Sequence, residues 1–99
     1  TILIDRPGTR LEQVHAQTPN SVMEEVDLLD RRNAELAIRR CAQKVGRIDG
    51  LCNIAGGFHA GDQVSSMPDD ALERMFDLNI KTLVNASSAV VPACVAPAV

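Results

Sequence analysis

Three short strand-like stretches, separated by stretches with helical periodicity, constrain the fold of this chain more than any other feature. They are residues 1–4, 22–28 and 48–53, each rich in apolar or β-branched residues. Strands that alternate with helices pair in parallel, because a right-handed crossover through a helix returns the chain to the same sheet. The sequence therefore predicts an α/β fold with the order β-α-β-α-β-α.

The helix between the second and third strands has the clearest limits. Asp30 is a favourable N-cap, and Gly46 stands where a glycine commonly ends a helix. Between them, apolar residues recur every three or four positions and predict a helix over 31–45 with one buried face. That face is predicted to contain Ala34, Ala37, Ile38, Cys41, Ala42 and Val45.

A shorter helix is expected after the first strand. Thr9 and Glu12 have the spacing of a capping box, and the helix that follows is predicted to turn Leu11 and Val14 inward.

The longest helix is expected over about 68–91, after a loop at 54–67. Ser66 and Asp69 have capping-box spacing, and Pro92 and Pro97 are expected to mark a frayed end. Its predicted inner stripe consists of Leu72, Met75, Phe76, Leu83, Ala86 and Val90.

Composition excludes several classes of protein. The net charge is −3, which argues against a nucleic-acid or anionic-membrane partner, and no apolar run approaches the roughly 20 residues of a membrane span. Cys41, Cys52 and Cys94 form no C-x-x-C pair, which favours reduced thiols in a cytoplasmic protein. His15 and His59 are far apart, so no metal site is expected.

Polar residues stand at the ends of the first two predicted strands, where ligands gather in open parallel sheets. The Asp5 carboxylate can accept hydrogen bonds from two ribose hydroxyls, although an ordinary turn aspartate explains it equally well. Arg6 can pair with a phosphate or lie over an adenine ring. Asp27 can accept from an adenine amino group, but taken alone it is more simply one polar residue leaving a strand.

The third predicted strand leads into Asn-Ile-Ala-Gly, at residues 53–56. Ala55 and Gly56 are small enough for a ligand to approach the backbone, and Gly56 can adopt a positive φ. Asn53 can connect neighbouring strands or orient the loop through its amide. For this motif alone, a glycine-rich turn remains an alternative.

Taken together, these motifs resemble the short-chain dehydrogenase/reductase family, over roughly residues 1–93. In that family an acidic residue follows the second strand, Asp-Val the third and Asn-Asn-Ala-Gly the fourth, and the next helix carries a stretch like Asp-Val-Asn-Leu. The matching residues are Asp5, Asp27-Leu28, Asn53-Ile54-Ala55-Gly56 and Asp77-Leu78-Asn79-Ile80. Ile54 replaces the second Asn of the motif.

The resemblance implies a partial NAD(P)-binding Rossmann domain over residues 1–99, part of a doubly wound parallel sheet. Because the family's sheet order is 3-2-1-4-5, the chain would lack the first strand, which belongs between residues 1–4 and 48–53. The glycine-rich turn would precede Thr1 and the Tyr-x-x-x-Lys pair would follow Val99; the chain contains no tyrosine. A piece of a larger protein is therefore expected.

The resemblance also implies an activity, namely hydride transfer between a nicotinamide and a carbonyl or alcohol substrate. Asn79 would be catalytic, holding a water at a local distortion of its helix. Cofactor contacts would come from Asp5, Arg6, Asp27, Leu28, Asn53, Ala55 and Gly56. Asp5 favours NAD, with NADP possible, and the long helix implies a homodimer or homotetramer.

Two other functions remain open from the sequence. The segment could be a non-catalytic cofactor-binding or structural piece, which flanking sequence would decide. A phosphoacceptor receiver domain is disfavoured, because its aspartate belongs at the end of the third strand, whereas Asp49 stands at the start. His59 lies in the loop and could face the substrate cleft, although a solvated loop histidine is the simpler interpretation.

Overall fold

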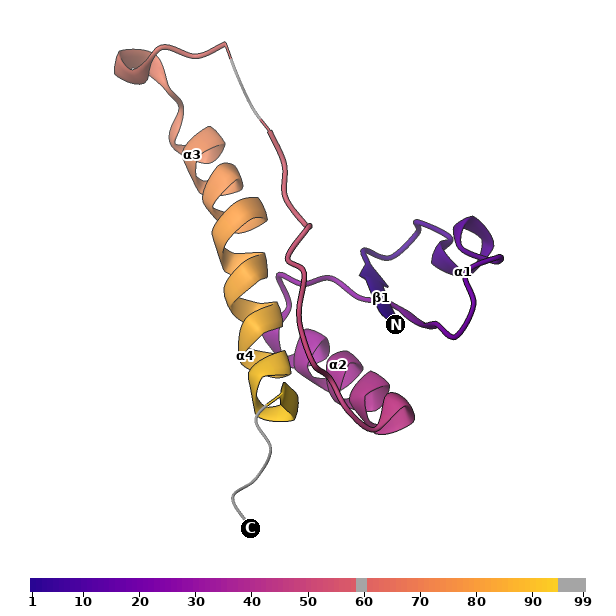
Figure 1. Cartoon of the computed structure of the whole chain (residues 1–99). Coiled ribbons are helices and arrows are strands. Elements are labelled where there is room, and N and C mark those ends of the chain that lie inside the picture. The colour runs from indigo at the N-terminus through magenta and orange to yellow at the C-terminus, as the bar shows by residue number, and fades with distance from the viewer. Residues whose placement is uncertain (59–60, 95–99) are drawn as a thin grey trace.

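The computed structural model describes residues 1–58 and 61–94 (Figure 1). The elements, in chain order, are β1 (Ile2–Asp5), α1 (Leu11–Val14), β2 (Val22–Glu25), α2 (Arg31–Val45), the 3₁₀ turn η1 (Val64–Ser66), α3 (Asp69–Phe76), the π-helical segment η2 (Asp77–Lys81) and α4 (Thr82–Cys94). None of the helices in these two ranges is long and apolar enough to cross a membrane.

The sheet consists of β1 and β2, which pair in parallel as predicted. Their register places Ile2 opposite Val22 and Asp5 opposite Glu25. The second strand is shorter than the predicted 22–28, because it ends at Glu25. The two carboxylates at the ends of β1 and β2 are therefore cross-strand neighbours.

The helix α2 forms as the sequence predicts. The Asp30 carboxylate accepts from the backbone N–H of Asn33 at 3.1 Å, and Gly46 ends the helix with φ 84°. Four residues of the predicted face are buried, whereas Val45 is 37% exposed. The buried residues are Ala34, Ala37, Ile38 and Cys41.

The predicted capping box at α1 is wrong. The residue before the helix is Arg10, in a left-handed conformation with φ 53°, and the hydroxyl of Thr9 donates instead to the carbonyl of Arg6. Leu11 is buried as expected, but Val14 is 68% exposed because a helix of one turn presents only one side chain to the sheet.

The third predicted strand does not form. Residues 48–53 run from the end of α2 towards α3 with no strand assignment, and the sheet of the described residues has two strands (Figure 1). A strand is defined by the backbone hydrogen bonds of a neighbour, and β1 is separated from this segment by an open groove.

The long helix starts at Asp69, after Pro68, with no side-chain cap from Ser66, so that capping box is also wrong. It continues through the π-helical segment η2, includes Pro92 and extends to Cys94, the last described residue, beyond the predicted end near 91. Pro97 lies outside the described residues.

The core lies between α2 and α4. Ile38, Ala86 and Val90 are buried against each other, with Ile4 and Leu28 packed on them. The radius of gyration is 15.8 Å, above the roughly 13 Å of a compact domain of about 100 residues.

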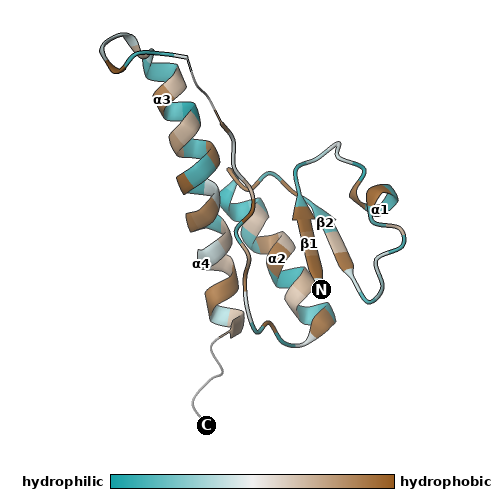
Figure 2. Cartoon of the chain, turned by 45° about the horizontal axis from the view of Figure 1, so that its top comes forward, coloured by the Kyte–Doolittle hydropathy of each residue, from teal (hydrophilic) through white to brown (hydrophobic). Residues whose placement is uncertain are grey.

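Half of the predicted inner stripe of the long helix is wrong, since Leu72, Phe76 and Leu83 are 61%, 57% and 43% exposed. For Leu72 and Phe76 the physical reason is that α2 packs against α4 while α3 projects beyond it (Figures 1 and 2). The apolar residues of α3 therefore have no layer of the described structure to pack against.

Candidate functional site

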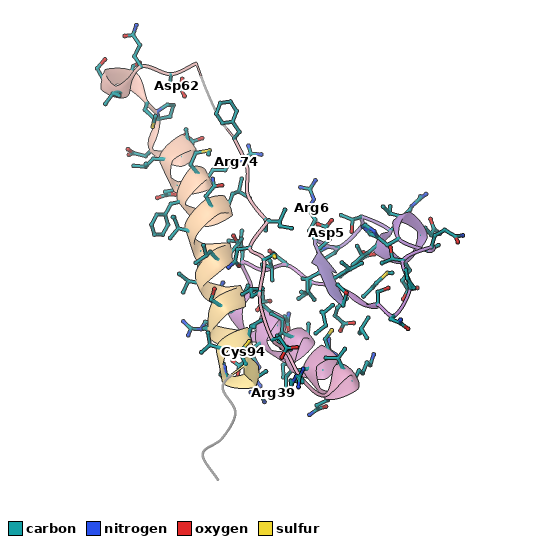
Figure 3. The ribbon with its side chains drawn as sticks, in the orientation of Figure 1. Asp5, Arg6, Arg39, Asp62, Arg74 and Cys94 are labelled. Atoms are coloured by element: carbon teal, nitrogen blue, oxygen red, sulfur yellow. The ribbon has the colours of Figure 1, made fainter. Side chains whose placement is uncertain are left out.

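The first side of the site is the carboxyl end of β1, where Asp5 and Arg6 are both exposed (Figure 3). Oδ1 of Asp5 accepts from the backbone N–H of Arg6 at 2.8 Å. Among the described residues, no protein donor bonds Oδ2. This oxygen is therefore available to accept a hydrogen bond from a ligand hydroxyl.

Asp27 and Leu28 follow the neighbouring strand. Oδ1 of the exposed Asp27 accepts from the backbone N–H of Leu29 at 2.9 Å, which forms a local turn. The carbonyl of Leu28 accepts from Nδ2 of Asn85 at 2.7 Å. Within residues 1–58 and 61–94, Asp27 thus retains one carboxylate oxygen for a ligand, and α4 holds the backbone beside it.

Asn85 is a residue that sequence reasoning missed. It is only 3% exposed, and its partner is 57 residues away in the chain. The available signal was a polar residue next to Ala86 on the inner face of the helix.

The second side of the site is the segment 53–57, which runs beside the long helix (Figure 1). Nδ2 of Asn53 lies 3.4 Å from Oγ of Ser87, so this amide connects the segment to α4 rather than to another strand. Ala55 and Gly56 are exposed. This backbone is accessible to a ligand.

Gly56 is required by packing and not by backbone conformation. The sequence suggested that Gly56 could adopt a positive φ, but its φ is not in the positive range. A Cβ at Gly56 would lie 2.7 Å from Oδ1 of Asn79, and one at Gly57 would lie 2.6 Å from Cδ1 of Leu78. Two consecutive glycines let the segment contact η2 directly.

Asn79 makes three hydrogen bonds, two to this segment and one within its own helix. Its Oδ1 accepts from the N–H of Gly57 at 3.2 Å, while Nδ2 donates to the carbonyls of Gly57 at 3.0 Å and Met75 at 2.9 Å. Asn79 stands inside the π-helical segment, so the helix is locally distorted at this residue. π-helical turns of this kind are frequent at functional sites.

An apolar groove of about 590 Å³ separates the two sides. Its walls are β1 and residues 48–55, with Ile38 and Ala86 among the residues of its floor. It lies between the first and third predicted strands.

The other residue types that could react or bind a metal do not contribute to this site. Burial, reinforced by Glu24 and opposed by Lys44 and Arg40, raises the pKa of the Cys41 thiol, so Cys41 is an unreactive core residue. The described part of the chain has no cluster of potential metal ligands. His59 lies outside the described residues.

The comparison with protein families identifies the family to which the chain belongs. The family model described as short chain dehydrogenase matches residues 1–98. The chain belongs to the short-chain dehydrogenase family. Its relatives include oxidoreductase UcpA of Escherichia coli K12, 39% identical over 70 residues that make up 71% of this chain and 26% of that protein.

A second relative matches more of this chain. Cis-1,2-dihydrobenzene-1,2-diol dehydrogenase of Pseudomonas putida is 32% identical over 98 residues, which make up 92% of this chain and 35% of that protein. Among solved structures, KRED1-Pglu superimposes with a TM-score of 0.81 at 17% identity, over 94% of this chain and 39% of that one. The chain thus spans about a third of the length of such relatives.

Proposed function

We propose that the protein containing this chain is an NAD(P)-dependent oxidoreductase, and that residues 1–99 form part of its cofactor-binding Rossmann domain. The single observation that carries the proposal is the attachment of Asn79, inside a π-helical turn, to the backbone of Gly57. This contact fixes the exposed segment 53–57 against the helix, at the end of the groove that borders β1.

The residues at the carboxyl end of β1 fit the adenosine part of such a cofactor. Oδ2 of Asp5 is free to accept from a ribose hydroxyl, and a carboxylate here would repel a 2′-phosphate. This favours NAD. Arg6 is exposed beside Asp5 and supplies the positive charge by which NADP could bind instead.

Other residues of the chain would border the cofactor without reacting. Asp27 offers one carboxylate oxygen to an adenine amino group, and Leu28 gives an apolar contact beside it. Asn53, Ala55 and Gly56 form the wall opposite, where the absence of large side chains admits a ligand to the backbone.

The cofactor, when bound, would exchange a hydride with a carbonyl or alcohol substrate. The residues of this chain would position the cofactor. Asn79 donates and accepts at fixed backbone atoms, so the proposed catalytic role of Asn79 is to keep the distorted turn open for a bound water. That role depends on the amide geometry, not on titration.

Titration of the full-length protein with NADH and NADPH, followed by cofactor fluorescence or calorimetry, tests the proposal. We expect saturable binding of NADH, tighter than that of NADPH. A protein that binds neither would refute the proposed function, and tighter binding of NADPH would refute the assignment of Asp5.

We further propose a homodimer or homotetramer, in a cytoplasmic protein, that pairs through the long helix. Phe76, Ile80, Leu83 and Val84 are 43–57% exposed at helical spacing, a surface of the kind that marks interfaces. Phe76→Glu would place a charge there and is expected to lower the mass measured by light scattering, while Glu73→Gln should not. An unchanged mass would refute the use of this face.

A further inference from the structure

Glu25, at the end of β2, is a side chain that the proposed cofactor chemistry does not use. Its carboxylate bonds two backbone N–H groups of the turn that follows β1. Oε1 accepts from Gly8 at 2.8 Å and Oε2 accepts from Leu11 at 3.0 Å. One exposed side chain thus closes the turn from both ends.

The turn needs such a restraint because its backbone is unfavourable by itself. Gly8 adopts φ 88° without strain because it has no Cβ, but Arg10 has φ 53°, which is uncommon for a residue with a Cβ. Conformations of this kind persist where the surroundings determine them. The two N–H groups held by Glu25 lie on either side of Thr9 and Arg10.

This turn begins directly after the residues that would face the adenosine ribose. Arg6 is its first residue, and the register places Asp5 opposite Glu25. Paired residues of neighbouring strands point to the same face, with the strands about 4.8 Å apart. Glu25 therefore determines the course of the turn and adds a second negative charge beside Asp5.

We infer that Glu25 is a positioning residue that sets the discrimination between NADH and NADPH. This inference rests on the proposed function. It holds the turn so that Arg6 is kept from pairing with a 2′-phosphate, and its charge adds to the repulsion from Asp5. A purely structural carboxylate would affect stability and leave this discrimination unchanged.

The chain offers a matched control one residue earlier. Glu24 carries the same charge on the same strand, but its carboxylate pairs with Arg40 of α2. Glu24→Gln and Glu25→Gln each remove one negative charge, and only the second removes an acceptor from the turn. The comparison separates a local effect from a change in net charge.

The test is the ratio of the dissociation constants of NADPH and NADH, measured by fluorescence on the full-length protein. A glutamine keeps one acceptor oxygen and replaces the other with a donor, so one charge-assisted bond is lost. We expect Glu25→Gln to lower the ratio about tenfold, the size of effect that one such bond gives, and Glu24→Gln to change it less than about twofold.

The outcomes that overturn the inference are distinct from failure of the proposed function. Wild-type protein that binds neither cofactor refutes the function itself. Wild-type binding with an unchanged ratio in Glu25→Gln, or with an equal change in Glu24→Gln, refutes the role of Glu25 alone.

Hydrogen exchange of the wild-type protein supplies a measurement that does not depend on folding of the variant. With NADH bound, the amides of Gly8 and Leu11 are expected to be protected, and more so than without it. Exchange at the rate of a free peptide at either amide would overturn the inference even if Glu25→Gln cannot be purified.

Discussion

The two sides of the groove are held by different chemical groups. On the helical side, the amides of Asn53 and Asn79 connect residues 53–57 to the long helix. On the sheet side, the carboxylate of Glu25 bonds two backbone N–H groups of the turn after β1. Amides donate as well as accept and carry no charge, whereas carboxylates only accept.

The difference separates two tasks that a dinucleotide site has to perform. The neutral, helical side positions the backbone, because an amide side chain can both donate a hydrogen bond to a backbone segment and accept one from it. The charged side can discriminate, because a carboxylate attracts hydroxyls and repels phosphate. Variants on the two sides should therefore differ in kind, with turnover changed on one and cofactor choice on the other.

The largest expected effect is on the helical side, in Asn79→Ala of the full-length enzyme. The substitution removes all three hydrogen bonds of the amide, which frees Gly57 and the carbonyl of Met75. We expect kcat to fall about 10²-fold, the size of loss that a misplacement of about 1 Å causes, with the NADH to NADPH preference unchanged.

Asn33→Ala is the control for Asn79→Ala, because Asn33 is an exposed helical amide in α2 that bonds Asp30. It should leave kcat within about twofold, since its contact lies outside the groove. Unchanged turnover in Asn79→Ala, measured under saturating cofactor, would show that the amide side has no part in catalysis.

The second largest effect is expected from Gly56→Ala, which changes the contact between Gly56 and Asn79. The new Cβ would meet Oδ1 of Asn79 at 2.7 Å, and that side chain is held by three bonds and cannot withdraw. Overpacking of this kind costs about 1–3 kcal/mol of unfolding free energy. Denaturant titration measures it, and turnover should fall in parallel.

Gly50→Ala is the matched control for Gly56→Ala, since a Cβ there would meet nothing within 4 Å and its φ is not positive. It is expected to be neutral or to stabilise by up to about 1 kcal/mol. Equal costs at the two glycines would mean that contact with Asn79 does not explain Gly56.

The sequence predicted those features whose causes are local. Asp30, Gly46 and the buried face of α2 follow from hydrogen bonds and periodicity within about four residues. The motif resemblance added the family and pointed to Asn79. The candidate contacts at Asp5, Asp27 and Asn53 came from their places at the ends of predicted strands, and the resemblance added their roles towards a cofactor.

The features that the sequence did not predict depend on distant partners. Residues 48–53 have strand composition, but a strand needs a neighbour at hydrogen-bond distance. Glu25 bonds residues 14 and 17 positions away, and Asn85 bonds one 57 positions away. The exposed side chains of α3 were predicted as buried because periodicity identifies an apolar face without naming what covers it.

The smallest expected effect tests whether a carboxylate outside the site also influences cofactor choice. Asp30 caps α2 through the N–H of Asn33, and Asp30→Ala should cost about 1 kcal/mol of unfolding free energy. Asp30→Asn keeps an acceptor of similar capping strength and should stay within about 0.5 kcal/mol of the wild type. Cofactor preference should be unchanged in both, because this carboxylate is engaged at the start of α2.

Glu25 differs in that its neutral replacement is expected to change cofactor choice. Denaturant titration of both Asp30 variants, with NADH and NADPH binding measured on the same samples, decides the point. A change of preference in Asp30→Asn would mean that cofactor choice follows the summed negative charge of the chain and not the turn held by Glu25.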